Sequence, residues 1–288
     1  MSCLIPYIIE IGPSNLHRAC ELASTKVTTR ISETREDDVI IRGYPISELI
    51  LKVPFGDGIF LVLSERFPTK AESRVFNGIL VSLIEHGMLN QALVARWVIR
   101  TAPESVQGAM AAGLLGVGDQ FGGASERVGE MLAQGVRQME NAGQSSGEVA
   151  DSIVTGYLER KERVPGFGHT IHRSVDPRAE ILLDIAKRER VSSKHVDLLE
   201  LVKNKLEVRT GKTLVINAMG AIGAIILDLG LDWRIAKGLM VVSKAPGILA
   251  HVHEEMRQPV ISELLPQIRN LIEYEGLTAR KVKDDYPR

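Results

Sequence analysis

The sequence has 288 residues, of which 44% are hydrophobic and 25% charged, a composition that is ordinary for a globular protein and excludes a disordered or fibrous chain. Its 35 basic and 36 acidic side chains give a net charge of −1, so no overall positive field favours a nucleic acid or an anionic membrane as partner. Two cysteines are too few for a disulfide framework, and we expect a cytoplasmic protein.

The first segment with a clear pattern covers residues 28–43. Two β-prone stretches flank an acidic turn at 36–38, which predicts a short hairpin. A helix is expected to begin after Thr69, because Thr69 and Glu72 have the spacing of a capping box. We expect that helix to continue to about Leu83, with its apolar side chains on one face.

The segment 108–124 contains six glycines and four alanines in seventeen residues. Each glycine weakens a helix by up to about 1 kcal/mol, so a compensating interaction is expected. Two interactions could offset this loss of helix stability, and the sequence does not exclude either or both. One is close packing of helices, in the core or across a dimer interface, and the other is close approach of the backbone to a ligand.

Two further helix starts are marked in the middle of the chain. Ser145 and Glu148 form a second capping box, and the helix is expected to run to about Arg160. Asp176 precedes Pro177, which combines a favourable N-cap with a proline at the first helical position.

The longest apolar run covers residues 214–227 and is shorter than the ~20 residues that a membrane helix requires. It predicts a buried core helix in a soluble protein, and the N-terminus, with no basic region before Glu10, does not resemble a secretory signal. Asp232 is expected to open a long helix toward Glu255, bent at Pro246. The predicted fold class is all-α with a small N-terminal β-hairpin.

Common cofactor and metal motifs are missing from the sequence. Gly116, Gly118 and Gly122 have the spacing G-x-G-x-x-x-G, which differs from the dinucleotide-binding motif, and no P-loop motif occurs. His251 and His253 are two residues apart and would not share a helix face. We therefore expect neither a nucleotide-binding loop of these types nor a bound metal.

The stretch 163–178, with the sequence RVPGFGHTIHRSVDPR, carries the strongest chemical signal. Its glycines predict a kinked loop whose backbone can approach a flat ligand, and His169 ends that loop as a candidate acid, base or hydrogen-bond donor. Arg173 follows, and Arg178 lies in the first turn of the next helix, where an anion is favoured. One loop therefore combines a proton-handling group with two anion-binding groups.

This stretch resembles the G-[FY]-G-H…R…D-P-R signature of the citrate synthase superfamily at the same internal spacing. The resemblance extends over about residues 25–265, and the run at 113–126, GLLGVGDQFGGASE, is most similar to the citryl-CoA lyase branch, including the C-terminal module of ATP-citrate lyase. Further similar segments are IRGYPISEL at 41–49, FPT at 67–69 and LIEHG at 83–87.

The resemblance implies a citrate-synthase-like helical fold with two domains. A large helical domain would comprise residues 1–121 and 222–288, and a small helical domain residues 122–221, with the active-site cleft between them. It implies a homodimer, coenzyme A as acyl-CoA substrate or product, and a keto dicarboxylate such as oxaloacetate as the second substrate. Nucleic acids, membranes and metals are not implied as partners.

The resemblance also assigns roles to residues of this sequence. His169 would bind the oxygen at the carbon that is joined or cleaved, and His86 would hold the keto dicarboxylate. Arg178 and Lys244 would bind substrate carboxylates. Seven residues would bind coenzyme A: Val164, Pro165, Gly166, Phe167, Gly168, Arg173 and Lys212.

Three positions depart from the family pattern. Phe121 stands where the synthases have a histidine that donates to the thioester carbonyl, as in the lyase branch. Met219 stands where the family has its catalytic aspartate, and a methionine can neither take nor give a proton. Lys244 replaces an arginine, which keeps the charge but loses the two-pronged carboxylate geometry.

Two functional hypotheses follow from this pattern. The first is an enzyme similar to citryl-CoA lyase or citrate synthase, in which another base, such as His172 or a substrate carboxylate, replaces the aspartate. The alternative is a catalytically silent protein that binds coenzyme A or a dicarboxylate as a sensor or partner subunit.

Overall fold

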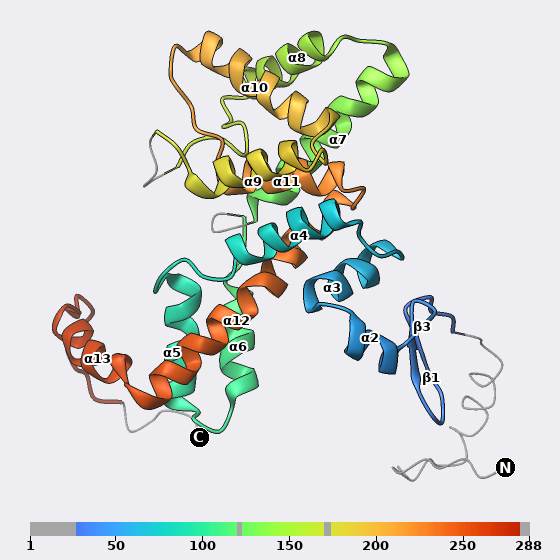
Figure 1. Cartoon of the computed structure of the whole chain (residues 1–288). Coiled ribbons are helices and arrows are strands. Elements are labelled where there is room, and N and C mark those ends of the chain that lie inside the picture. The colour runs from blue at the N-terminus through green and yellow to red at the C-terminus, as the bar shows by residue number, and fades with distance from the viewer. Residues whose placement is uncertain (1–26, 120–122, 170–173, 283–288) are drawn as a thin grey trace, which may run out of the picture. The chain divides into compact units, whose positions relative to one another are not determined.

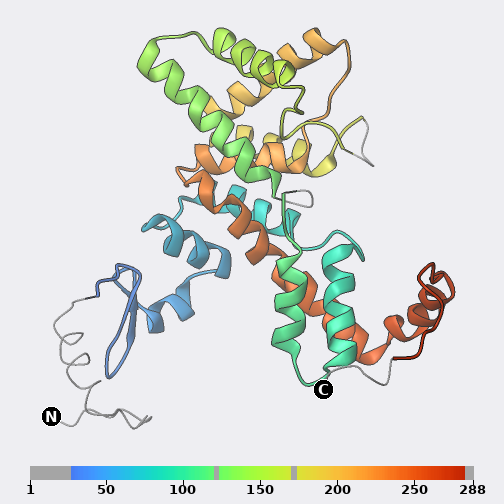
Figure 2. The same ribbon diagram turned by 180° about the vertical axis from the view of Figure 1, so that it is seen from behind.

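The computed structural model describes residues 27–119, 123–169 and 174–282. The chain forms two compact units, which meet in sequence between Phe67 and Pro68. Figure 1 and Figure 2 show that helices make up most of the described chain, with strands near its N-terminal end. The predicted all-α fold class is confirmed.

The first unit contains a small antiparallel sheet. Thr34 pairs with Val39 across the acidic turn, so the predicted hairpin is confirmed. A third strand extends it after a tight turn in which Arg42 and Gly43 have φ values of 49° and 87°. That strand has two residues, too few for a recognisable alternation in the sequence. The elements are β1 (Ser32–Thr34), β2 (Val39–Ile41), β3 (Tyr44–Pro45), α2 (Ile46–Lys52) and α3 (Phe55–Ser64).

The second unit consists of helices joined by loops, and its helices pack in two groups (Figure 1). One group contains α5 (Asn90–Thr101), α6 (Val106–Leu115) and α12 (Ala236–Arg257), and the other contains α7 to α11, between Ala124 and Asp228. The domain boundaries implied by the resemblance, at 121/122 and 221/222, remain a prediction. The helices are α4 (Lys70–Ser82), α5 (Asn90–Thr101), α6 (Val106–Leu115), α7 (Ala124–Ala142), α8 (Ser146–Glu159), α9 (Pro177–Arg188), α10 (Lys194–Thr210), α11 (Ala218–Asp228), η1 (Trp233–Ile235), α12 (Ala236–Arg257) and α13 (Val260–Asn270).

The helix starts predicted from capping patterns are confirmed. Complete capping boxes open α4 at Thr69 and α8 at Ser145. The side chain of Asp176 caps α9, which has proline at its first position. Asp232 caps the short helix η1, which continues directly into α12, and Pro246 lies inside that helix.

The core helix predicted within residues 214–227 is α11, of which eight residues are buried. Glycine allows its neighbour α7 to approach closely. A Cβ atom on Gly223 would lie 2.7 Å from the carbonyl oxygen of Ser125 and 2.8 Å from the side chain of Val128. A larger residue at Gly223 would push α7 and α11 apart.

Helix α6 uses its small residues in the same way. A Cβ atom on Gly113 would lie 2.8 Å from the carbonyl oxygen of Gln91 and 2.9 Å from the Cβ of Ala95, both on α5. Of the two compensations left open by the sequence, close packing within the chain therefore applies to this helix. The buried cluster around this contact contains Ala92, Ala95, Ile99, Ala109, Ile248 and Val252.

The stretch Trp233–Arg257 is the one part of the described chain that is long and apolar enough to span a membrane by length and composition. Its central helix α12 packs against α5 and α6 and buries the charged side chains of Lys244 and Glu255. These contacts are typical of a core helix, since ionised side chains are costly in lipid.

Candidate active site

The glycine-rich loop that leads to His169 is anchored to the segment before α11. The backbone N–H of Gly168 donates to the carbonyl of Val215 (2.8 Å), and the N–H of Asn217 donates to the carbonyl of Gly166 (3.0 Å). Gly166 and Gly168 have φ values of 90° and 78°, in the left-handed region that favours glycine. The loop therefore has the kink predicted from the sequence.

The two glycines of this loop have different surroundings. A Cβ atom on Gly220 would lie 2.5 Å from the carbonyl oxygen of Gly166, so the backbones of the loop and α11 touch. The close approach expected at Gly166 thus serves packing against α11. A Cβ atom on Gly168 would meet no atom of the described residues within 4 Å, so among these residues Gly168 leaves space where a ligand could lie.

Asp176 joins the start of α9 to the start of α11 and is 1% exposed. Its Oδ1 accepts hydrogen bonds from the backbone N–H and Nε of Arg178 (both 3.1 Å). Its Oδ2 accepts from Nη2 of Arg178 (3.0 Å) and from the N–H of Ala218 (2.9 Å). Burial opposes ionisation, but these donors prevail and hold the pKa of the Asp176 carboxyl below its usual range.

The same contacts orient the guanidinium group of Arg178. Two of its five N–H donors bond to Asp176, which leaves others for the carboxylate that the sequence predicts it to bind. An arginine that is already oriented loses less side-chain entropy when a ligand arrives.

Asn217 is a positioning residue that the sequence analysis missed. Its Oδ1 accepts from the N–H of Gly220 (3.0 Å) and caps α11, while its Nδ2 donates to the carbonyl of Gly168 (2.9 Å). The sequence did contain a signal, because asparagine is a favoured N-cap before an apolar helix. Met219 lies within this capped turn and is half-buried. The structure therefore places Met219 beside the loop that carries His169.

Lys244 lies in the middle of α12 and is 6% exposed. Burial lowers the pKa of its ammonium group, the carboxylate of Glu85 acts against this shift, and the guanidinium of Arg178 adds to it. Lys244 forms no ion pair with a carboxylate of the described residues. The two residues predicted to bind substrate carboxylates are thus brought within electrostatic range of each other, although they are on different helices.

His86 lies in the exposed loop between α4 and α5. Its backbone N–H donates to Oε1 of Glu85 (2.8 Å), and the same oxygen lies 3.2 Å from Nε2 of His251 on α12. His86 is thereby linked to α12, the helix that carries Lys244. His86 was predicted from the sequence as a site residue, whereas Glu85 and His251 were not.

The remaining predicted residues are placed only in part. Val164 is buried, and Phe167 forms an isolated bridge with Ile216. His169 is half-buried at the end of the loop, and Lys212 is exposed, shortly before the segment that pairs with the loop. Phe121, Arg173 and the alternative base His172 lie outside the described residues.

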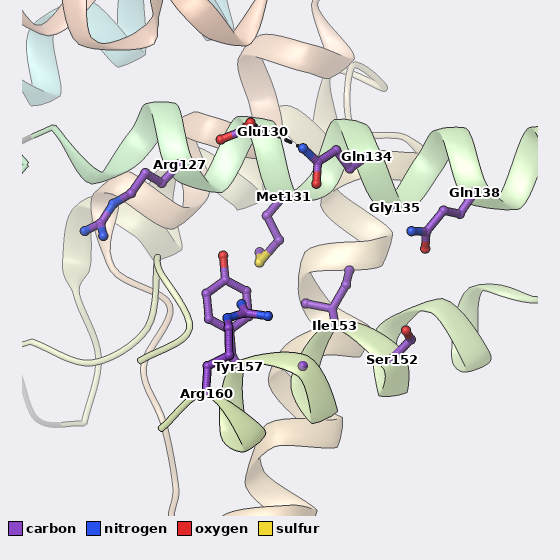
Figure 3. A pocket seen from close by; sticks show the side chains of 11 residues that line it. Arg127, Glu130, Met131, Gln134, Gly135, Gln138, Ser152, Ile153, Tyr157 and Arg160 are labelled. Atoms are coloured by element: carbon purple, nitrogen blue, oxygen red, sulfur yellow. Dashed lines mark hydrogen bonds between the residues drawn. The ribbon is translucent and has the colours of Figure 1, made fainter. Parts of the chain in front are cut away.

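A pocket of about 510 Å³ lies between α7 and α8 (Figure 3). Its walls carry charged and polar side chains from both helices, including Arg127 and Glu130, and the guanidinium of Arg160 lies 4.8 Å from the ring centroid of Tyr157. None of the assigned residues that the structure describes is among those that line it. Within the described part of the chain, this pocket is therefore separate from the candidate active site.

Comparisons with known proteins agree with the resemblance seen in the sequence. Residues 68–264 match the family model described as "Citrate synthase, C-terminal domain". Among solved structures, citryl-CoA lyase from Hydrogenobacter thermophilus is 32% identical, with a TM-score of 0.77, over 91% of this chain and 99% of that chain.

Curated relatives are longer than this chain. A Dictyostelium discoideum protein named Probable ATP-citrate synthase is 26% identical over 81% of this chain and 39% of its own length. Citrate synthase 2 of Bacillus subtilis is 27% identical over 69% of this chain and 51% of its own length. The chain thus spans about half or less of the length of these two relatives.

Proposed function

Because the chain belongs to the citrate synthase family, we propose that it is a coenzyme A-dependent carbon–carbon lyase that cleaves, or forms in reverse, citryl-CoA or a similar acyl-CoA. The structural similarity to citryl-CoA lyase along nearly the full length of both chains favours this activity. Under this proposal the small N-terminal unit and the helical unit would both belong to the enzyme.

The observation that carries the proposal is the pair Lys244 and Arg178. Keeping the buried Lys244 ammonium charged without a carboxylate in an ion pair costs free energy, and the positive charge of Arg178 increases this cost. A bound carboxylate would neutralise both effects. This pair would suit a substrate with carboxylate groups, as expected for the citryl part of citryl-CoA or for oxaloacetate.

The coenzyme A part would bind along the loop at 164–168. Its backbone is fixed by the pairing with 215–217, and the open space at Gly168 lets a flat group approach. Arg173 and Lys212 would supply charged contacts to the phosphates. This arrangement would place the acyl group near the end of the loop, at His169.

The cleavage itself requires four changes at the reacting atoms. A base takes the proton of the substrate hydroxyl, the carbon–oxygen bond becomes a ketone, the adjacent carbon–carbon bond breaks, and its electron pair remains on the acyl α-carbon, which then takes a proton. His169 would bind the oxygen that changes from alcohol to ketone, and His86 would orient the keto acid. Since Met219 cannot act on the α-carbon, another group, or a substrate carboxylate that has first taken up a proton, would supply that proton.

The proposal is tested by incubating the purified chain with citryl-CoA. We expect acetyl-CoA and oxaloacetate in equal amounts, with oxaloacetate measured through its reduction by NADH and malate dehydrogenase. If calorimetry detects binding of coenzyme A and oxaloacetate but the incubation yields no product, the chain would instead be a catalytically silent binding protein. Met219 in place of the catalytic aspartate is the argument for this alternative. Failure to bind either ligand would contradict both functions.

A further inference from the structure

A chain of polar contacts runs from the buried core of the second unit to the candidate active site. It starts at Arg96 on α5, which is 0% exposed and donates through Nη1 to Oε2 of Glu255 (3.0 Å). The other oxygen of Glu255 accepts from the N–H of Ile261 at the start of α13 (2.9 Å). Arg96 is therefore fixed in place, and Glu254 pairs with the same guanidinium.

The next residue in the chain is His251 on α12. Nε and Nη2 of Arg96 lie 3.1 and 3.0 Å from its Nδ1. An arginine side chain has donors and no acceptor, so Nδ1 must accept and carries no proton. The ring proton is therefore on Nε2, which faces Oε1 of Glu85 at 3.2 Å and donates to it.

Glu85 ends the chain, within electrostatic range of Lys244. Its carboxylate accepts from His251 and from the N–H of His86, and α12 makes room for it, since a Cβ atom on Gly247 would lie 2.6 Å from Oε2. Burial raises the pKa of the Glu85 carboxyl, but these donors and the charge of Lys244 prevail and lower it. Glu85 thus stays ionised and acts on Lys244 through space, without an ion pair between them.

We propose that His251 is a positioning residue for substrate binding: Arg96 fixes its tautomer, and its Nε2–H holds the Glu85 carboxylate away from the Lys244 ammonium. This inference rests on the proposed function. Glu85 then compensates part of the charge of Lys244 but leaves the Lys244 ammonium group available to the substrate carboxylate. If the hydrogen bond from His251 is lost, Glu85 can turn toward Lys244, form a direct ion pair and compete with the substrate carboxylate.

The test compares three variants of the full chain by calorimetry with oxaloacetate and, separately, with coenzyme A. His251→Leu removes the donor, and oxaloacetate should bind about tenfold more weakly, as expected for the loss of one hydrogen bond to a charged group. His251→Gln can still donate to Glu85 and should stay within about threefold of the wild type. His253→Leu, an exposed histidine on the same helix, should change neither affinity.

The affinity for coenzyme A should be the same in all three variants, because a local effect at Lys244 leaves the loop at 164–168 untouched. If His251→Leu lost affinity for oxaloacetate and for coenzyme A to the same extent, this would indicate general destabilisation and overturn the inference. It would also be overturned if His251→Leu bound oxaloacetate as well as the wild type does. A wild-type protein that bound neither ligand would instead contradict the proposed function.

A second measurement does not depend on ligand binding or on the stability of a variant. Nitrogen-15 chemical shifts of labelled histidine in the wild type report which ring nitrogen carries the proton, and the signal of His251 is assigned by its loss in His251→Gln. We expect the proton on Nε2. A proton on Nδ1 would contradict the geometry with Arg96 and with it the inference.

Discussion

Met219 occupies the position at which the resemblance implies a catalytic aspartate. It is half-buried in the first turn of α11, between Ala218, whose N–H is bound by Asp176, and Gly220, which packs on Gly166. A carboxylate at 219 would therefore lie in a turn whose backbone is fixed on both sides. Methionine fills this space without proton chemistry.

Met219→Asp tests whether the missing carboxylate limits the reaction. Acid–base catalysis contributes about 10²–10⁴-fold, so we expect the rate with citryl-CoA to rise by at least about tenfold if the surrounding groups are in place. Met219→Leu serves as the apolar control and should leave the rate unchanged. The rate and the melting temperature are measured for both variants.

One outcome would contradict this account of Met219. If Met219→Asp stays folded and binds coenzyme A but gains no activity, the active site has been rebuilt around another base. A buried carboxylate without a partner would then lower the stability and add nothing to the rate.

The residues of the candidate site differ in how far the sequence could predict them. His169 and Arg178 belong to one short motif, and the contacts of Arg178 with Asp176 are local. The partners of His251 are remote: Arg96 is 155 residues away in sequence. No local pattern indicates that such residues meet, because their contact depends on the packing of α12 against α5.

At the scale of elements, the contact between the 164–168 loop and α11 depends on glycine. A Cβ atom on Gly220 would lie 2.5 Å from the carbonyl oxygen and 3.1 Å from the Cα of Gly166. Backbone atoms cannot move aside as a flexible side chain can. The capping patterns predicted where the helices begin, but this contact joins two separate segments and could not be predicted from either.

Gly220→Ala should therefore destabilise the protein by about 1–3 kcal/mol, the usual cost of overpacking, and weaken the binding of coenzyme A. Gly238→Ala is the control, since a Cβ atom there would meet nothing within 4 Å in the part of the chain that the structure describes, and alanine favours helix. Chemical denaturation of both variants measures the effect. Equal stability of the two would contradict the close contact.

Asp228 at the end of α11 holds the start of α10. Its buried carboxylate accepts from the N–H of Ser193 (2.7 Å) and lies 2.7 Å from Nδ1 of His195. Burial opposes ionisation, but these donors prevail, and the pKa of the Asp228 carboxyl is lowered from its usual 3.8. A lowered carboxyl pKa stabilises the fold above about pH 3.8, and this stabilisation is lost as the pH falls through the lower value of the folded state.

Asp228→Asn should thus be less stable than the wild type at pH 7, by about 1–3 kcal/mol for a disrupted buried network. The difference should shrink as the pH falls below 3.8, because the carboxyl of the unfolded wild type takes up a proton there, whereas that of the folded protein does so only at its lower pKa. Melting temperatures between pH 7 and pH 3 measure this convergence. A constant difference over that range would mean that the ionisation of Asp228 does not contribute to stability.

At the scale of the whole molecule, we expect a homodimer. Helices α5 and α6 bury small residues against each other, yet large apolar side chains remain exposed on them: Leu115 is 85% exposed, Val94 42% and Trp97 36%. Exposed apolar groups of this size favour a protein–protein contact. Light scattering should give twice the mass of 31.6 kDa, and Trp97→Glu should reduce it to that of one chain. A wild-type monomer at micromolar concentration would contradict this prediction.

The central claim is that Lys244 and Arg178, which lie within electrostatic range of each other, bind the carboxylates of the substrate. The most direct test is the steady-state kinetics of Lys244→Met with citryl-CoA, because methionine keeps the buried aliphatic chain and removes the charge. We predict that KM rises at least about tenfold, as expected for a lost charge-assisted contact, while the affinity for coenzyme A alone stays unchanged. A folded Lys244→Met variant with the KM of the wild type would contradict the claim.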